Sequence, residues 1–432
     1  MITKTKVFLM ITLLLVLYGC GKKEQKTQLQ QPGEKIKLVY TYWGDTQEMA
    51  VVDKYVDAFE KSNPDIKIQK MHIAGQRYSD KFLTMCASGL GPDVFYIPPN
   101  DIVSYIDKGL LLELDDLIKN DKNFNMDDYL PGVFEPYKHN GKLYGVPRAD
   151  QTLVIYFNKD LFDKSKLKYP DENWTWDDFF EICKKLTKDT DGDGKIDEYG
   201  YAIPICWWGF YLSIIQKGGQ FFNKDLTKCL IDTPEVINIL QWWQDFALKY
   251  KLSPILMGNQ AGTHEMFYTG KVAMYPMGMW VVAEFNKMIK NFKWDICMFP
   301  KNSDGRRPTL AFYAGWGINK NSKHIDAAWR FVKFIAGKEG QTIVVEAMHD
   351  VPPLKSIAYS DKFLTPNIPP EHDKVFLDMM KDRVYFPLHP KIGEMSDIWR
   401  DAFESMFVSG GKPVKEICID AAKRINKLLK EK

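Results

Sequence analysis

Short runs of β-branched and aromatic residues alternate with helical patterns between residues 36 and 110. The runs IKLVYTYW (36–43), IKIQKMHI (66–73) and DVFYI (93–97) have the composition of strands. Between the first two runs, apolar residues recur at the spacing of one helical face: Met49, Val52, Val56 and Phe59. Strands separated by helices at such short intervals predict an α/β lobe built on a parallel sheet.

The remainder of the chain continues this pattern less regularly. TLVIYFN (152–158) and TGKVAMYPMG (269–278) have the composition of strands. Amphipathic patterns predict several further helices, over residues 234–250, 324–336, 396–408 and 414–429. No repeating period is present, which excludes a solenoid. A mainly helical second half with scattered strands indicates a second α/β lobe.

Residues 1–20 have the pattern of an export signal. Two lysines precede an apolar run over residues 7–17, which is shorter than the about 20 residues of a stable membrane span. The Gly-Cys step at Cys20 resembles the bacterial lipobox, in which the cysteine accepts a diacylglycerol. We expect residues 1–20 to be a lipoprotein signal segment that is removed up to Cys20. Cys20 would then be the first residue of the mature protein and anchor it on the extracellular face of the cell membrane, and polar residues 21–35 would form a flexible tether. The alternatives are an ordinary secretory signal and a signal anchor.

Charge and cysteine usage exclude other classes. The chain has 58 basic and 56 acidic residues, a net charge of +2, and this balance argues against nucleic acid as a partner. Neither Cys nor His recurs at the spacing of zinc ligands. Apart from Cys20, we therefore expect free thiols at six positions, with one disulfide left open: Cys86, Cys183, Cys206, Cys229, Cys297 and Cys418.

The segment DTDGDGKIDEYGY (189–201) has the residue order of a calcium loop. Its candidate ligands are Asp189, Asp191, Asp193, Lys195 through its carbonyl, and Asp197. Gly194 stands where such a loop turns sharply. The twelfth position is Gly200 instead of a bidentate carboxylate, so the local ligand set is incomplete. The segment predicts either a structural calcium site or an Asp/Gly-rich turn without a metal.

Catalytic motifs are mostly absent from the sequence. There is no GxSxG, no P-loop, no HExxH and no GxGxxG after a strand. A pair of glycosidase carboxylates is not excluded by inspection, because 56 acidic residues offer many pairs. By motif, the sequence indicates neither an enzyme nor the requirement for a cofactor.

Tryptophans beside turns are the better functional signal. Flat aromatic faces stack on sugar rings, and polar neighbours satisfy the hydroxyl groups. The candidates drawn from the residues alone are Trp43, Trp207, Trp208, Trp280, Trp316, Trp399 and the adjacent Arg400. The alternative for each tryptophan is packing within its own lobe.

Several segments together resemble one known family, the extracellular solute-binding proteins of ABC importers, in the group that includes maltose-binding protein. They are GPDVFYI (91–97), GKLYGVPRADQTLVIYFNKDLF (141–162), NWTWDDFFEICKKLT (173–187), FYTGKVAMYPMGMW (267–280), AGWGINKNSKHIDAAWRFVKFIAGKEGQ (314–341) and VPP (351–353). The resemblance covers residues 36–432. It implies a two-lobed α/β fold of type II, with a central ligand cleft and lobes joined by crossing hinge strands. Lobe 1 would comprise 36–152 and 315–360, and lobe 2 would comprise 153–314 and 361–432.

The resemblance also carries ligand-binding roles onto matching positions. Trp280 would be the sugar-stacking tryptophan of lobe 2, and Trp399 an aromatic residue of the helix that closes over the ligand. The other matching positions are Trp43 and Asp45 in the first strand–helix turn, and Arg148 and Asp150 near the hinge. After DVFY the chain departs from the family pattern, which leaves the identity of the ligand open.

The implied function is capture of a carbohydrate, expected to be an oligosaccharide, and its delivery to an ABC transporter permease. We expect a monomer, because such a hinge works within one chain. The alternatives are a binder of a non-sugar solute such as a peptide or phosphoester, an extracellular carbohydrate-active enzyme, and a sensor or adhesion lipoprotein without a permease.

Overall fold

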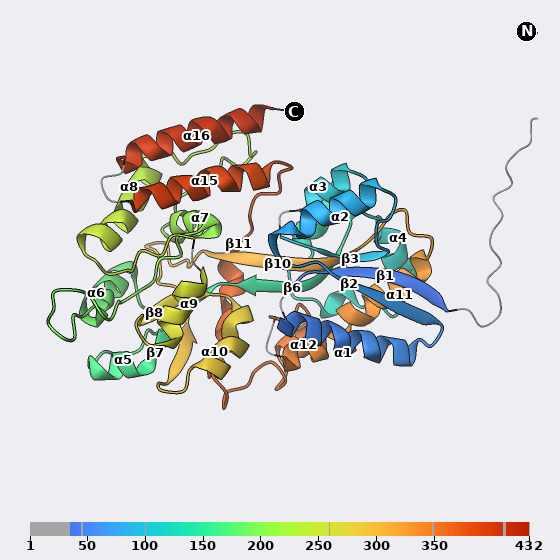
Figure 1. Cartoon of the computed structure of the whole chain (residues 1–432), viewed down its shortest axis with the longest axis horizontal. Helices are drawn as coiled ribbons and strands as arrows, with labels where there is room; N and C mark the ends of the chain where they lie inside the picture. The colour runs from blue at the N-terminus through green and yellow to red at the C-terminus, as the bar shows by residue number, and fades with distance from the viewer. Residues whose placement is uncertain are drawn as a thin grey trace, which may run out of the picture.

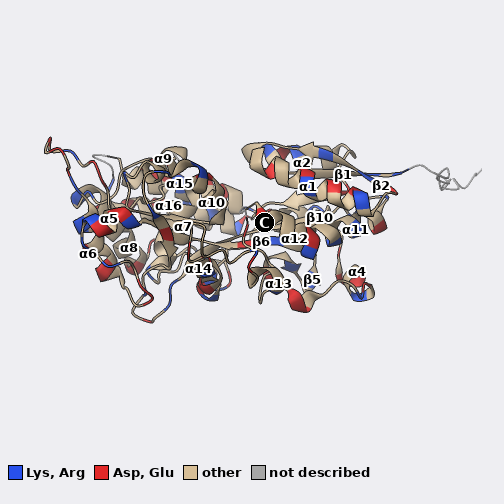
Figure 2. Ribbon diagram, turned by 90° about the horizontal axis from the view of Figure 1, so that it is seen from below, with Lys and Arg blue, Asp and Glu red and all other residues tan. Residues whose placement is uncertain are grey.

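The computed structural model describes residues 35–44, 46–99, 101–258, 260–347, 350–408 and 412–431. Two predicted positions, Cys20 and Asp45, lie outside this part of the chain. The described residues form two α/β lobes that lie side by side, with strands running from one lobe into the other (Figure 1). Basic and acidic residues are interspersed over both lobes in the view of Figure 2, in keeping with the balanced charge.

Lobe 1 is built on a mixed sheet. Its strands are β1 (Ile36–Tyr42), β2 (Ile66–His72), β3 (Val94–Ile97), β6 (Val146–Thr152), β10 (Thr309–Ile318) and β11 (Arg383–Val384). The order is β2-β1-β3-β10, with β6 and β11 also paired to β10. β1 runs parallel to β2 and β3, as the strand–helix alternation predicted, whereas β10 is antiparallel to β3 and to β6.

Helices cover both faces of this sheet (Figure 1). The helices of lobe 1 are α1 (Thr46–Ser62), α2 (Tyr78–Ala87), α3 (Ile102–Asp107), α4 (Asp115–Asn120), α11 (Ile325–Ala336), α12 (Lys338–Glu346) and α13 (Lys355–Ala358). The short 3₁₀ turns are η1 (Gly75–Arg77), η2 (Met126–Asp128) and η3 (Glu135–Tyr137). A small hairpin is formed by β4 (Lys138–His139) and β5 (Lys142–Leu143). On one face Phe331 of α11 packs on Phe59 of α1, with ring centres 4.9 Å apart. On the other face Phe82 of α2 packs on Phe95 of β3 at 4.4 Å.

The buried stripe of α1 differs from the predicted one at three apolar or aromatic residues. Met49 is exposed, and Val51 and Tyr55 are buried beside the predicted Val52, Val56 and Phe59. Tyr55 joins the core because its hydroxyl lies 2.8 Å from the hydroxyl of Tyr40 on β1. The buried face of α1 thus includes a tyrosine that apolar spacing alone did not indicate.

Lobe 2 has a small antiparallel sheet surrounded by helices. The sheet order is β8 (Met274–Met277), β7 (Val154–Asn158) and β9 (Trp294–Cys297). Its helical segments are α5 (Lys159–Lys164), α6 (Trp176–Leu186), α7 (Trp207–Gln216), α8 (Pro234–Gln244), a π-helical turn η4 (Asp245–Lys249), α9 (Gln260–Tyr268), η5 (Met279–Val281), α10 (Val282–Met288), α14 (Lys374–Asp378), η6 (Met379–Asp382), α15 (Ile392–Met406) and α16 (Val414–Lys430). Tyr156 of the central strand packs against Phe285 at 5.4 Å and Trp294 at 5.7 Å.

The two lobes are joined through β6, β10 and β11. β6 and β10 pair side by side from Thr152 opposite Ala311 to Val146 opposite Trp316, with a bulge near Ala314. Where β6 passes into β7, the Thr309 hydroxyl donates a hydrogen bond to the carbonyl of Leu153 at 2.8 Å. Interstrand hydrogen bonds therefore continue across the junction, and they hold the groups near it in place.

All six cysteines of the described residues are free, as predicted. Cys183, Cys229, Cys297 and Cys418 are buried and Cys86 and Cys206 are half-buried. Burial raises the pKa of the Cys86 thiol to about 11, which keeps it protonated and unreactive. Within the described part of the chain, no helix has both the length and the apolar character needed to cross a membrane.

Candidate functional site

The turn after β1 presents one aromatic side chain to solvent. Trp43 is 42% exposed, and its ring centre lies 5.8 Å from that of Tyr96 on β3. Gly44 has φ +145°, and a Cβ there would lie 2.2 Å from Cγ of Glu48. Glycine is therefore required at this position. The absence of a side chain at Gly44 leaves room for the Glu48 side chain beneath the turn, while the indole of Trp43 stays exposed to solvent.

A buried ion network lies beneath this turn. The Arg148 guanidinium lies 2.6 Å from an oxygen of Glu48 and 2.7 Å from an oxygen of Asp350, and all three side chains are buried. Gln151 donates a further hydrogen bond to Asp350. Burial opposes the charge on Arg148, but the two carboxylates outweigh it and raise the pKa of Arg148 further. The network joins α1, β6 and the segment after α12.

Asp150 lies two residues further along β6 in a second buried group. The Tyr385 hydroxyl donates a hydrogen bond of 2.6 Å to its carboxylate, and the Arg383 Nε lies 3.1 Å away. Burial raises the pKa of Asp150 to about 6, although Arg383 and Tyr385 act in the opposite direction. Both predicted hinge positions, Arg148 and Asp150, are therefore buried and already paired.

Aromatic side chains gather around Phe312 on the lobe 2 side of these groups. The rings whose centres lie within 6.3 Å of the Phe312 ring are Trp280 at 5.4 Å, Phe386 at 5.9 Å, Trp208 at 6.0 Å and Trp207 at 6.3 Å. These five rings, with Trp399 behind them, are called the aromatic cluster below. They come from β10, η5, α7 and the segment after β11, so four parts of the chain converge there.

Trp280 and Trp207 are the half-buried tryptophans of the aromatic cluster. The ring of Trp280 lies over Gly278, where an added Cβ would come within 2.0 Å of it. The carbonyl of Gly278 accepts a hydrogen bond of 2.7 Å from the Tyr156 hydroxyl, which fixes the turn. The missing side chain at Gly278 and the hydrogen-bonded turn thus determine the orientation of the Trp280 ring.

The other two predicted tryptophans of the cluster are buried behind this surface. Trp208 is buried, and Trp399 is fully enclosed. The indole N–H of Trp399 donates a hydrogen bond of 2.6 Å to the carbonyl of Trp207. Trp399 thereby supports the first turn of α7. Arg400 lies on the outer side of α15, where it pairs with Asp397 and Asp401.

Trp316 corrects one sequence-based expectation. It is fully buried in lobe 1, and its indole N–H donates a hydrogen bond of 3.1 Å to the Tyr40 hydroxyl. Tyr40 in turn packs on Phe331 of α11 at 5.2 Å. The flanking Gly315 and Gly317, which resembled a turn, instead allow close packing, because a Cβ on Gly315 would lie 2.4 Å from Tyr137.

Seven residues of the site were missed from the sequence: Glu48, Gln151, Phe312, Asp350, Arg383, Tyr385 and Phe386. Glu48 carried a weak signal as an acidic residue on an otherwise apolar helical face. Tyr385 and Phe386 are adjacent aromatic residues before a proline, in a segment without periodicity. Phe312 and Asp350 carried no signal that separates them from core or loop residues.

The acidic loop of lobe 2 brings part of its predicted ligand set together. Carboxylate oxygens of Asp189, Asp191 and Asp197 lie within 4.8 Å of one another. Asp193 instead pairs with the Lys195 ammonium at 2.9 Å. Gly192 and Gly194 have φ near +80° and leave the loop free to turn. The loop is exposed and belongs to the surface of lobe 2.

A cavity of about 270 Å³ lies at the edge of lobe 1 where β1 begins and β10 ends, away from the hinge. Its lining includes Asp93, Asn319 and Ser322. The Asp93 carboxylate accepts hydrogen bonds from the Ser322 hydroxyl at 2.6 Å and the Val39 N–H at 2.8 Å. Since its polar groups bind one another, this cavity is structural, and the interlobe side chains remain the candidate ligand site.

Known proteins share both the sequence pattern and the fold. The galactooligosaccharide-binding protein of Bacillus subtilis is 25% identical over 434 residues, 98% of this chain and 96% of that protein. The maltooligosaccharide ABC transporter solute-binding lipoprotein of Streptococcus pneumoniae is 24% identical over 433 residues, 97% of this chain and 95% of that protein.

Among solved structures, an ABC substrate-binding protein of Listeria monocytogenes in complex with cycloalternan superposes with a TM-score of 0.82. It is 28% identical and covers 92% of this chain and 100% of that chain. The predicted two-lobed α/β fold is confirmed. The profile of the bacterial extracellular solute-binding protein family matches residues 27–342, most of the chain. The chain therefore belongs to the bacterial extracellular solute-binding proteins.

Proposed function

We propose that this protein captures an oligosaccharide outside the cell and delivers it to the permease of an ABC importer. The observation that carries the proposal is the pair of aromatic surfaces flanking the hinge. Trp43 is exposed at the end of β1, and Trp280 and Trp207 are half-buried in the aromatic cluster. Aromatic faces with a few fixed polar groups between them are the lining that carbohydrate sites use.

The buried polar groups near the hinge suit binding without chemistry. Arg148 and Asp150 are held by other side chains, so neither is poised as a nucleophile or a free base. Relatives over nearly the full length are named for binding galactooligosaccharides and maltooligosaccharides. A micromolar complex corresponds to about 8 kcal/mol, which two stacked rings and several hydrogen bonds can supply.

The test is thermal unfolding of the protein against a panel of sugars. The panel contains galacto-, malto- and arabino-oligosaccharides and a cyclic glucan, with a peptide mixture and a phosphoester as comparison solutes. A ligand at a hundred times its dissociation constant adds about 2.7 kcal/mol to the free energy of unfolding. We expect one sugar class to raise the Tm and to be recovered unchanged by chromatography. Stabilisation by the peptide or phosphoester alone, or consumption of the sugar, would contradict the proposal.

The proposal includes a lipid anchor at Cys20. An apolar run followed by a Gly-Cys step supports it, and a relative over 97% of the chain is named a lipoprotein. We expect the mature protein to sediment with membranes, and the C20S variant to be released into the medium. Equal distribution of the two proteins would contradict the anchor and leave sugar binding unaffected.

We further propose that the acidic loop at Asp189–Asp197 binds a structural calcium ion. The convergence of Asp189, Asp191 and Asp197 supports it, because calcium prefers carboxylate and carbonyl oxygens. We expect calcium to raise the Tm of the protein but not of the D189N/D191N variant. Equal shifts in both proteins would contradict calcium binding at this loop.

A further inference from the structure

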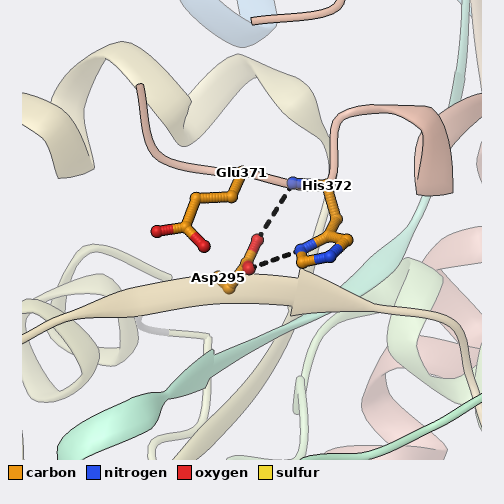
Figure 3. A group of neighbouring side chains, drawn as sticks. All are labelled: Asp295, Glu371 and His372. Carbon is orange, nitrogen blue, oxygen red and sulfur yellow. Dashed lines mark hydrogen bonds and ion pairs between the residues drawn. The ribbon is translucent and has the colours of Figure 1, made fainter. Parts of the chain in front are cut away.

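A second group of metal-ligating side chains lies outside the interlobe site. Asp295 on β9 is 1% exposed, and its carboxylate points toward the chain segment that carries Glu371 and His372 (Figure 3). His372 binds both oxygens of Asp295, through its backbone N–H at 3.2 Å and its Nδ1 at 2.6 Å. One ligand atom of each side chain lies within 4.8 Å of the other two.

The immediate surroundings carry more negative than positive charge. Asp295 and Glu371 place two carboxylates together, and Asp373 follows directly in the chain. The Lys159 ammonium is 3.1 Å from one oxygen of Glu371. The Lys159 ammonium therefore offsets one of the two carboxylates of the group. A divalent cation at this point would balance the charge that the lysine leaves uncompensated.

The mixture of ligand atoms distinguishes this group from the acidic loop. It offers one imidazole nitrogen and two carboxylate oxygens, whereas calcium and magnesium prefer oxygen alone. Zinc accepts both atom types at about 2.0–2.2 Å, and a set of three protein ligands leaves one position for water. The His372 side chain is 67% exposed and the Glu371 side chain 47% exposed, so an ion can enter from solvent.

We propose that Asp295, Glu371 and His372 bind one zinc ion. The ion takes the place of the hydrogen bond between His372 and Asp295, and small rotations of the exposed Glu371 and His372 side chains close the ligand set around the buried Asp295. The site is separate from the interlobe residues and goes beyond solute capture. Its ligands lie 77 residues apart along the chain, which is why motif spacing does not reveal it.

The proposed zinc site lies where the chain passes from lobe 1 to lobe 2. Glu371 and His372 lie between α13 of lobe 1 and α14, in the segment by which the chain leaves lobe 1. Pro369 of this segment accepts a hydrogen bond of 2.7 Å from Asn286 of α10. Earlier in the same segment, Thr365 lines a narrow gap together with Val345 of α12 and Met279 of lobe 2. A zinc ion would link the segment between α13 and α14 to β9 of lobe 2.

The test is calorimetric titration of zinc chloride into the untagged full-length protein in mild detergent. Calcium is present throughout at a saturating concentration, so that the acidic loop cannot take up zinc. We expect one zinc ion per chain, a higher Tm with zinc, and ligand-field absorption of four-coordinate cobalt(II) in place of zinc. Removal of one ligand in H372Q should weaken zinc binding about 100-fold, because loss of a group that merely hydrogen-bonds a metal ligand already costs about 10–100-fold.

Two residues of lobe 1, the half-buried His139 and the exposed Glu135, provide matched controls. H139Q removes a histidine of the β4–β5 hairpin, and E135Q removes a glutamate that pairs with Lys138 at 2.7 Å as Glu371 pairs with Lys159. Both controls should bind zinc as the unchanged protein does, whereas E371Q should bind it more weakly. The proposal is overturned if zinc does not bind in the presence of calcium, or if H372Q and E371Q bind zinc as tightly as the controls.

Discussion

The two sides of the hinge region are built from different chemistry. On the lobe 1 side, Arg148 is buried between Glu48 and Asp350 in a network of full charges. On the lobe 2 side, Trp280 and Trp207 stand half-buried in a cluster of rings with no formal charge. The charged side is closed to solvent, and the aromatic side keeps part of its surface open.

This difference separates two kinds of contribution to the same site. A buried charge is costly unless it is paired, so each member of the network holds the others in place and the fold depends on the set. An aromatic ring at a surface packs with no such dependence and keeps a face for a ligand. Substitutions in the buried charge network should therefore change stability first, and those of the partly open aromatic rings should change affinity first.

The largest effect is expected from R148M. The substitution leaves Glu48 and Asp350 buried without their cation, and loss of one partner of a buried pair costs about 3–5 kcal/mol. Urea unfolding of the two proteins measures the loss. The matched control is R400M, since Arg400 also pairs with two carboxylates but at the surface, where the cost should stay below about 1 kcal/mol. Similar losses for both variants would show that the network does not support the fold.

A smaller effect is expected from the pH dependence of Asp150. Its folded-state pKa is raised to about 6 from an ordinary value of 3.8, so the folded protein retains the proton more strongly than the unfolded chain. The resulting stabilisation is complete below about pH 4 and is lost as the pH rises through 6. At about 1.4 kcal/mol per pKa unit, the loss is on the order of 2–3 kcal/mol.

D150N lacks this proton and serves as the reference for the pH experiment. Urea unfolding of both proteins between pH 4 and pH 7 gives the difference in their free energies of unfolding at each pH. We expect the native protein to lose stability relative to D150N as the pH rises, because Arg383 and Tyr385 offset only part of the burial. A difference that stays constant, or that grows in favour of the native protein, would show that Asp150 is ionised at low pH.

The elements of the fold were predictable because their signals are local. The strand at 36–42 and the helix from Thr46 follow from periodicity within a few residues, and the same holds for the parallel pairing of β1 with β2. The antiparallel placement of β10 beside β3 and β6 was not predictable in this way. It depends on a chain that returns from lobe 2 after about 150 residues, and no local pattern encodes that return.

The same distinction between local and long-range signals applies to the candidate site. Trp43 and Trp280 were identified because each tryptophan stands beside a glycine-marked turn in the sequence. The partners of Arg148 were not, since Glu48 lies 100 residues before it and Asp350 follows it by a still longer stretch. Trp316 also stands between glycines, yet its ring is in the core. A glycine beside a tryptophan thus indicates close packing, but not whether a ligand or the protein packs there.

On the aromatic side, W280A should lower sugar affinity more than it lowers stability. The ring meets Phe312 and keeps part of its surface free, so its removal takes away a large stacking face. We expect a loss of about 2 kcal/mol in binding, about thirtyfold in Kd, by calorimetry with the sugar identified by the unfolding screen. W242A removes another half-buried tryptophan, one that packs on Trp243 at 4.8 Å, and should leave the Kd unchanged. Equal effects would place the ligand elsewhere.

W43A should give the smallest effect on sugar affinity, with almost no change in stability. Trp43 is 42% exposed and its ring touches only the Tyr96 ring among the described aromatic side chains, so the free energy of unfolding should change by less than about 0.5 kcal/mol. Sugar affinity should nevertheless fall about tenfold if, as we propose, the ring forms part of the lobe 1 face of the site. Y250A, which removes an aromatic side chain 44% exposed on the far part of lobe 2, should change neither quantity. If W43A binds as well as Y250A, lobe 1 holds its ligand through polar groups alone, and the contrast between the two sides of the hinge becomes sharper than proposed.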